Sequence, residues 1–405
     1  MLIEMRIILN YFINLVNNKK SILFTLIYSL LNSKFIYFKC LILITFFSLQ
    51  VKNTHAQEKK KDKEKSPFYF NLTVDEDLFL LKSTDQFYSF GTAITAGWKG
   101  LDNKFTRALT LKAKDSHDLY TVSFAHRMYT PKNVEQTEVD STDIPFCGQT
   151  FLRLGRESFS PSHGYILETY LDIGVVGEIA GADFFQNKFH SAIGNGAING
   201  WKNQIGNGLL LNYTVIYKQD FVSVLPFVEN FLILRATVGT MDISAEGSIQ
   251  LRIGLFNNHF VNGERPWSKK ENTSSFYKLK ETKYAKMKYN SGMWSQDETL
   301  REQSAESWLS RNFKITQAYI KFVSGGMLNV YSGEMQGSLI PFEESPYVIE
   351  YHQIPKLIHT LSVGVVLTHR IGAFEYHWDR HNYQPENTFP PLYPKWGRFN
   401  MKFNF

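Results

Sequence analysis

The last nine residues of the chain, GRFNMKFNF (397–405), alternate strictly between two kinds of side chain. One set is apolar and the other is polar or charged, with Phe399, Met401, Phe403 and Phe405 set against Arg398, Asn400, Lys402 and Asn404. Successive side chains of a β-strand point to opposite faces of its sheet. The stretch therefore predicts a strand with one apolar and one polar face.

The same alternation recurs along the chain. In YILETYLDIGVV (165–176) the odd-numbered positions are Tyr, Leu, Thr, Leu, Ile and Val, whereas the even-numbered ones include Glu168 and Asp172. Comparable segments are separated by Gly, Asn, Asp and Pro, and they are 88–98, 105–113, 119–129, 208–218, 247–255, 316–323 and 359–367. A soluble β-sandwich also alternates, so this pattern alone leaves two architectures open.

Two features favour a barrel in an outer membrane. Aromatic residues make up 15% of the chain and many lie near predicted strand ends, as in the aromatic girdles of such barrels. The final strand, which ends in a C-terminal Phe, resembles the terminal strand of outer-membrane barrels. No apolar run after residue 67 approaches 18 residues, which excludes transmembrane helices. We therefore predict an all-β fold, an antiparallel transmembrane β-barrel of about twelve strands.

The N-terminal region differs from the rest of the chain. Residues 34–56 (KFIYFKCLILITFFSLQVKNTHA) have a basic start, an apolar run and a small-residue cleavage site, which indicate a secretory signal. An uncleaved anchor is the alternative, but the apolar run is shorter than the ~20 residues of a spanning helix. We predict a targeting region over 1–56, a charged linker over 57–67 and the barrel domain over 68–405, exported to the bacterial outer membrane as a monomer.

The charge of the chain is concentrated in the targeting region. Residues 1–56 hold six of the 44 lysines and arginines and one of the 38 acids, which leaves 38 basic and 37 acidic residues beyond them. A nucleic-acid partner is therefore not expected. Removal of the targeting region would also remove Cys40 and leave Cys147 alone, so no intramolecular disulfide is expected.

The alternation breaks in GEIAGADFFQNKFHSAIGNG (177–196). Phe184, Phe185, Phe189 and Ile193 recur there at helical spacing, so we predict a short helix that Asp183 caps and Gly194 ends. Gln186 and His190 then share one face, with Asn187 beside them. A histidine held by neighbouring amides suits a general base. The alternative is a histidine that packs against the barrel wall.

Several ordered motifs resemble one family, the lipid A 3′-O-deacylases or LpxR-like outer-membrane proteins. The main block is DIGVVGEIAGADFFQNKFHSAIGNGAINGWKNQ (172–204). The others are VDEDLF (74–79), TDQFYSFG (84–91), YTP (129–131), DIPFCG (143–148) and NVYSGEMQGS (329–338). The resemblance covers most of residues 70–405. It implies a twelve-stranded barrel and a calcium-dependent esterase that removes the 3′-acyloxyacyl chain of lipid A.

The resemblance also implies roles for individual residues. The catalytic histidine corresponds to His190, with Gln186 beside it, and the family's hydroxyl residue corresponds to Ser89. The calcium-binding Asn-Asp pair corresponds to Glu76 and Asp77. Two positions depart from the pattern, since Ser89 replaces Thr but keeps the hydroxyl, and Glu76 replaces Asn and adds a negative charge. Calcium accepts six to eight oxygen ligands and tolerates that change better than magnesium does.

Together these residue types supply what the hydrolysis of an ester requires. We expect His190 to take a proton from the attacking water, and a calcium ion at Asp77 and Glu76 to stabilise the oxyanion. Ser89 would donate a hydrogen bond; its action as a covalent nucleophile is less favoured, because the sequence places no acid to complete a triad. Without the resemblance, residues 75–77 would be interpreted as a solvated acidic turn.

Other interpretations remain open. Five lysines in FYKLKETKYAKMKY (276–289), at 278, 280, 283, 286 and 288, either form a solvated loop or contact the lipid A phosphates. A phospholipase-type esterase would use the same histidine, hydroxyl and calcium. A non-catalytic barrel, a pore or an adhesin that has lost activity, would need neither the helix nor the acidic pair.

Overall fold

The computed structural model describes residues 68–80, 87–135, 137–141, 143–194, 196–221, 227–256, 259, 315–369, 372–381 and 394–404. The chain divides into two units, Met1–Lys65 and Ser66–Phe405, and the described residues all belong to the second. The predicted targeting region, the linker, the lysines at 278–288 and Phe405 lie outside the described residues.

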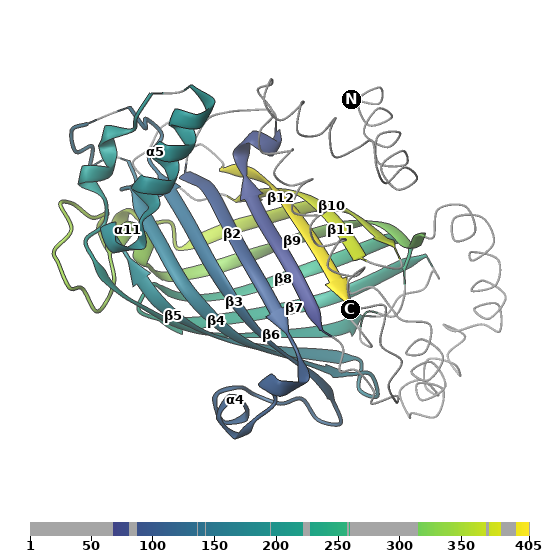
Figure 1. Cartoon of the computed structure of the whole chain (residues 1–405). Coiled ribbons are helices and arrows are strands. Elements are labelled where there is room, and N and C mark those ends of the chain that lie inside the picture. The colour runs from purple at the N-terminus through teal and green to yellow at the C-terminus, as the bar shows by residue number, and fades with distance from the viewer. Residues whose placement is uncertain are drawn as a thin grey trace, which may run out of the picture. The chain divides into compact units, whose positions relative to one another are not determined.

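Within the described residues, twelve antiparallel strands close into a barrel (Figure 1). Each strand pairs with the next along the chain, and the first pairs with the last. The strands are β1 Tyr69–Glu76, β2 Phe87–Gly97, β3 His117–Thr130, β4 Cys147–Ser160, β5 Tyr165–Val176, β6 Gly208–Phe221, β7 Val228–Gly239, β8 Asp242–Leu255, β9 Ile315–Ser332, β10 Leu357–His369, β11 Gly372–His381 and β12 Lys395–Asn404. The predicted fold class is confirmed.

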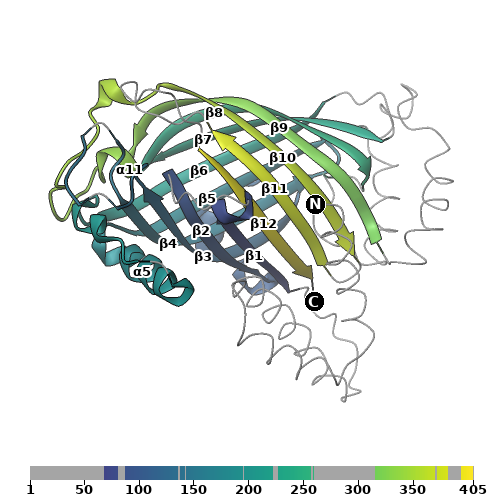
Figure 2. The same ribbon diagram turned by 90° about the horizontal axis from the view of Figure 1, so that it is seen from above.

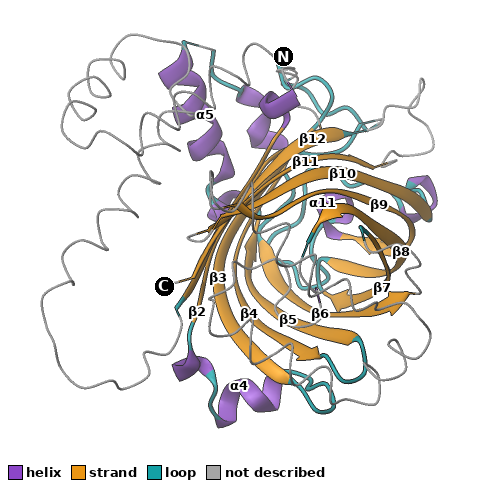
Figure 3. Ribbon diagram, turned by 90° about the vertical axis from the view of Figure 1, so that its right-hand side faces the viewer, coloured by secondary structure: helices purple, strands orange, loops and turns teal. Residues whose placement is uncertain are grey.

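Short helices lie in the connections. The α-helices are α4 Lys104–Leu109, α5 Ala182–Ile193 and α11 Gly333–Gln336, and the 3₁₀ helices are η2 Asp77–Leu80, η3 Lys99–Leu101, η4 Glu178–Ala180, η5 Asn199–Asn203 and η7 Tyr351–Gln353. Both α5 and α11 lie at one end of the barrel, which we call the α5 end (Figures 1 and 2). The connection that carries α4 lies at the other end, the α4 end, outside the strands (Figure 3). None of the described helices is long and apolar enough to cross a membrane.

The two faces of the wall differ as the terminal strand predicts. Ion pairs connect neighbouring strands on the inner face, for example Arg398–Asp75 at 2.7 Å, Arg153–Asp172 at 2.6 Å and Arg252–Glu229 at 2.6 Å. The outer face carries exposed apolar side chains, among them Ile94, Phe124, Leu152, Ile173, Leu234, Ile249 and Val365. This is the arrangement of a barrel whose outer surface faces lipid.

Apolar clusters fill part of the interior. One includes Phe151 and Leu210 together with Met241 from the β7–β8 turn. Another joins Ile144 of the β3–β4 connection to Met335 and Ile349 of the β9–β10 connection at the α5 end. Near the α4 end, Phe159 and Phe231 pack together. The first two clusters hold connections at the α5 end in place.

The predicted strand over 105–113 is wrong. Residues Lys104–Leu109 form α4, because Asn103 and Thr106 make a capping box in which the Asn103 side chain accepts hydrogen bonds from the Phe105 and Thr106 amides. The Thr106 hydroxyl accepts a hydrogen bond from the Asn103 amide in return. A local cap of this kind starts a helix whatever the hydrophobic pattern that follows.

Candidate active site

The helix α5 packs against the outer wall of β3 and β4 near the α5 end (Figure 1). Directly paired residues connect this part of the wall to the end of β1. Glu76 pairs with Phe90 of β2, Phe90 with Met128 of β3, and Met128 with Gly148 of β4. A Cβ at Gly148 would lie 2.6 Å from Cβ of Ala182, which is a severe overlap. The glycine is therefore what lets the first turn of α5 approach the wall.

The ends of α5 differ partly from prediction. Gly194 ends the helix as expected, since it adopts φ 82° and its amide donates to the carbonyls of His190 and Ser191. Asp183 does not cap the start, because Gly181 occupies the N-cap with φ 75° and no side-chain hydrogen bond. Asp183 lies instead in the first turn, where a negative charge favours the helix dipole.

The His190 ring is held in one tautomer. Its Nδ1 lies 3.3 Å from the carbonyl oxygen of Gly196, and a carbonyl can only accept, so Nδ1 carries the proton. The neutral ring then has its lone pair on Nε2, which is the form that a general base requires. The side chain is 6% exposed and is therefore shielded from bulk water.

Asn187 secures the loop that supplies this carbonyl. Its Oδ1 accepts a 2.7 Å hydrogen bond from the Ile198 amide, and its Nδ2 donates to the Ile198 carbonyl at 3.4 Å. The returning chain is thus bound to α5 two residues after Gly196. Gln186 and Asn187, the two neighbouring amides of the helix, therefore have different roles. Asn187 holds the loop that orients His190.

Gln186 forms a hydrogen bond with Trp201 instead. Its Oε1 accepts a 2.7 Å hydrogen bond from Nε1 of Trp201, and an indole N–H can only donate. The orientation of the Gln186 amide is therefore determined, and its –NH₂ group is the part that can donate elsewhere. Trp201 itself is buried in a cluster with Met128, Phe146, Ala182 and Ile198.

Ser89 reaches the same cluster from the barrel wall. It sits where the β2–β3 register shifts, between Tyr88 and Phe90, and it is almost completely buried. Its hydroxyl donates to the Met128 carbonyl at 3.3 Å. Ser89 and α5 thus share Met128, and the hydroxyl must rotate away from this carbonyl to donate to a substrate.

The two acidic residues lie where β1 ends. Glu76 is its last residue, on the face opposite to Asp75, and Asp77 begins η2 with a buried side chain. From inside the barrel, Asp75 accepts hydrogen bonds from Tyr88 (2.8 Å) and Arg398 (2.7 Å). This interior pairing fixes the strand ends that carry Glu76, Asp77 and Ser89.

The donor chemistry of this pair fits calcium. Carboxylates are hard oxygen ligands, and one of the two is shielded from solvent. Among the described residues, no group of three or more His, Cys, Asp or Glu side chains is arranged to hold a metal. Glu76 and Asp77 could therefore supply only part of a shell of six to eight oxygens, with backbone carbonyls, Ser89, water or substrate completing it.

His126 belongs to the same region and was not predicted. Its Nδ1 lies 2.7 Å from Oγ1 of Thr150, and that hydroxyl donates its proton to the Ala180 carbonyl at 2.9 Å. Nδ1 must therefore donate, so Nε2 carries the lone pair, and no described residue forms a hydrogen bond with this buried atom. The ring lies 5.1 Å from that of Phe185 on α5. One sequence signal could have identified His126. It follows Val122 and Phe124 at alternate positions of the strand, so an imidazole occupies a face that is otherwise apolar there.

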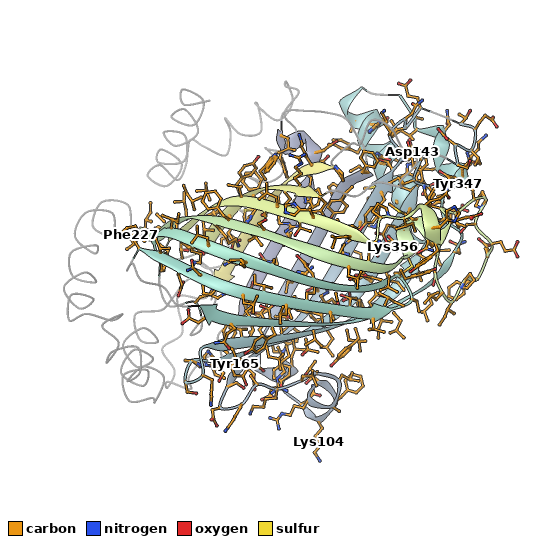
Figure 4. The ribbon with its side chains drawn as sticks, turned by 180° about the vertical axis from the view of Figure 1, so that it is seen from behind. Lys104, Asp143, Tyr165, Phe227, Tyr347 and Lys356 are labelled. Carbon is orange, nitrogen blue, oxygen red and sulfur yellow. The ribbon has the colours of Figure 1, made fainter. Side chains whose placement is uncertain are left out.

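A connection beside the site contains a perturbed carboxyl group. Burial raises the pKa of Asp143, an effect that hydrogen bonds from the Lys132 and Ile144 amides partly offset. Burial and the Asp143 charge likewise raise the pKa of Tyr347, and both residues lie at the α5 end (Figure 4). Asp143 thus holds the β3–β4 connection in place near Phe146, whose ring is tilted by 48° to that of Trp201 with centroids 4.9 Å apart.

The structure brings most of the predicted site together. Gln186 and His190 share one helix, and Ser89 is joined to that helix through Met128. Glu76 is related to it by strand register, and Asp77 follows Glu76 in the chain. The catalytic and metal-binding roles of these residues remain predictions.

Comparison with known proteins gives a family. The family model described as outer membrane protein LpxR matches residues 41–405. Among solved structures, LpxR from Salmonella typhimurium is similar with a TM-score of 0.56 at 14% identity, covering 83% of this chain and 100% of that one. The β-domain of the Bordetella autotransporter BrkA gives 0.32 at 8% identity, covering 84% and 99%, which is too low to support an argument. No curated protein sequence matches the chain. Because the family model spans nearly the whole chain, this outer-membrane protein belongs to the LpxR family.

Proposed function

We propose that the protein is an outer-membrane lipid A deacylase that hydrolyses the ester linking the 3′-acyloxyacyl chain. The observation that carries the proposal is the hydrogen bond from His190 Nδ1 to the Gly196 carbonyl, which leaves Nε2 as the basic atom. Family membership and the amide orientation of Gln186 support it.

The position of α5 suits a lipid substrate. The helix lies against the outer wall, and its Phe184 and Phe185 are 59% and 56% exposed. Aromatic side chains of this kind are favourable at a membrane interface. We place the α5 end toward the cell exterior, where lipid A forms the outer leaflet, so that a lipid ester reaches the site sideways from the membrane.

The chemistry follows from the residues of the chain. His190 Nε2 accepts a proton from the attacking water, a step worth about 10²–10⁴-fold in rate. The Gln186 –NH₂ donates to the oxyanion, since Trp201 occupies its carbonyl oxygen. The proton held by His190 then returns to the leaving alkoxide. A calcium ion held by Asp77 and Glu76 would supply Lewis-acid stabilisation of that oxyanion.

Two alternatives lead to different results. A pore is disfavoured by the apolar side chains that pack together inside the barrel, because the lumen of a porin is polar and water-filled. A phospholipase-type esterase would use the same base and differ only in substrate.

The test is incubation of the folded protein with lipid A and, separately, with diacyl phospholipid, each with calcium and with EDTA. Calcium-dependent release of acyl chains from lipid A alone supports the proposal. Release from phospholipid alone would replace it with the second alternative.

A further inference from the structure

The connection between β2 and β3 packs against the outside of the barrel at the α4 end. We call residues 98–116 the strap. Its Leu111 amide donates to Thr169 on β5 at 3.3 Å, and its Lys114 amide donates to the Tyr165 hydroxyl at 2.8 Å. Ser160, at the end of β4, donates to the Lys114 carbonyl at 2.6 Å. The strap thus crosses β4 to reach β5 on the outer wall, below the level of the candidate active site (Figures 3 and 4).

A cavity of about 480 Å³ lies between the strap and the wall. Asp102, Arg107 and Lys112 of the strap line one side, and Asp118, Tyr120 and Arg156 of β3 and β4 line the other. These strand residues belong to the outward-facing set, because the inner set of β4 contains Arg153 and that of β3 contains Ser123 and Arg127. The cavity therefore opens on the lipid-facing side of the barrel.

The cavity has one positive charge more than its carboxylates neutralise. Arg107 binds Asp102 through two hydrogen bonds, of 2.6 and 2.9 Å. Arg156 binds Asp118 through Nη2 at 2.7 Å. Lys112 is the third cation, and its Nζ lies 3.9 Å from Asp118, too far for a hydrogen bond. Three cations thus face two carboxylates.

Arg156 adds an unsatisfied donor. The residue is 3% exposed and its guanidinium lies 5.0 Å from the centroid of the Tyr120 ring. Its Nε is buried and finds no hydrogen-bond acceptor among the described residues. A buried N–H of a charged group without an acceptor is costly, and with the uncompensated charge of Lys112 it makes this part of the cavity favourable for an anion.

The surroundings indicate where such an anion comes from. The strap also carries exposed apolar side chains, since Phe105 is 69%, Leu111 48% and Trp98 38% exposed, and Leu111 lies between the lining residues Thr110 and Lys112 in the chain. Aromatic and apolar groups next to cations on the outer wall are typical of the membrane interface. A soluble anion would not require this apolar border, whereas a phospholipid brings acyl chains with its phosphate.

We propose that this cavity, the strap pocket, binds the phosphate group of an anionic phospholipid in the leaflet at the α4 end. The lipid phosphate pairs with the Lys112 ammonium and the Arg156 guanidinium of the lining, while its chains lie along Phe105 and Leu111. The pocket is at the opposite end of the barrel from α5 and does not depend on the deacylase proposal. Its occupation would fasten the strap to the wall.

The test measures lipid retention by native mass spectrometry of the purified barrel in a non-ionic detergent. Short-chain phosphatidylglycerol is the probe, the matching phosphatidylcholine is the charge control, and inorganic phosphate is the competitor. We expect the wild type to retain phosphatidylglycerol at least tenfold more tightly than phosphatidylcholine. We expect Lys112→Gln and Arg156→Gln each to weaken that retention about tenfold.

The matched control is Lys104→Gln, which removes an exposed positive charge from the same strap but not from the pocket lining. It should retain phosphatidylglycerol like the wild type. Equal retention of the two lipids, or an equal loss in Lys104→Gln and Lys112→Gln, would overturn the pocket. Displacement of the lipid by inorganic phosphate at equal concentration would overturn the lipid assignment and make free phosphate the ligand. Lys112→Gln decides the outcome if Arg156→Gln fails to fold.

Discussion

The indole Nε1 of Trp201 donates a 2.7 Å hydrogen bond to Oε1 of Gln186 and thereby fixes which end of that amide is a donor. Trp201→Phe keeps the aromatic packing but releases the amide. Loss of an oxyanion donor costs about 10²–10³ in kcat, so we expect a loss of kcat within that range. Steady-state kinetics on lipid A would measure it. The double variant Trp201→Phe, Gln186→Ala should lose no more than Gln186→Ala alone, because the two residues act as one unit. Additive losses of kcat in the double variant would show that Trp201 and Gln186 act independently.

His126 offers Nε2 as a buried acceptor beside α5. We expect this atom to accept a hydrogen bond from a hydroxyl or amide N–H of the substrate. His126→Phe should therefore raise KM for lipid A by about tenfold with little change in kcat, as an unmade hydrogen bond is worth about 0.5–1.5 kcal/mol. Thr150→Val, which removes the partner of Nδ1, should act in the same direction. A loss confined to kcat would instead assign His126 to the chemical step.

Gly148 permits the close approach of α5 to the wall, since a Cβ there would overlap Ala182. Gly148→Ala should displace the start of the helix and reduce activity by at least tenfold while the barrel still folds. Gly247→Ala is the control, because its nearest neighbour to an added Cβ is 3.7 Å away. Heat-modifiable migration on gels reports folding, and lipid A hydrolysis reports the site. Full activity of Gly148→Ala would show that α5 needs no such contact.

Metal removal tests the role of the acidic pair. EDTA should abolish hydrolysis, calcium should restore it, and magnesium should restore it poorly, because magnesium demands strict octahedral geometry. Asp77→Asn should weaken the response to calcium. Glu76→Asn removes one negative ligand charge and should raise the calcium concentration for half-maximal activity without abolishing turnover. Unchanged activity in excess EDTA would remove calcium from the mechanism.

Much of this architecture follows from side-chain alternation. It predicts β5 and β12 well, because their outer faces meet lipid and their inner faces carry Asp172 or Arg398. Alternation does not predict β7, because its inner residues Phe231 and Ile233 pack in an interior apolar cluster and the middle of the strand is therefore apolar on both faces. Alternation does not predict β4 for the opposite reason. Its outer face carries the charged Arg156, which lies under the strap instead of facing lipid.

The site is predictable where the residues lie close in sequence. Helical spacing places Gln186 and His190 together, and the structure confirms the helix. Ser89 and α5 meet only through Met128, a contact between segments that local spacing does not reveal. The tautomer of His190 depends on Gly196, whose position depends in turn on Asn187. Such geometry comes from the folded chain rather than from any single motif.

The central claim is that His190 is the base for hydrolysis of a lipid A ester. Mass spectrometry of lipid A after incubation with folded wild type, His190→Ala and His163→Ala tests it most directly. His163 lies in the β4–β5 turn at the α4 end and serves as the matched control. The account predicts calcium-dependent loss of the 3′-acyloxyacyl chain with wild type and His163→Ala, and intact lipid A with His190→Ala. Deacylation of lipid A by folded His190→Ala at the wild-type rate would contradict it.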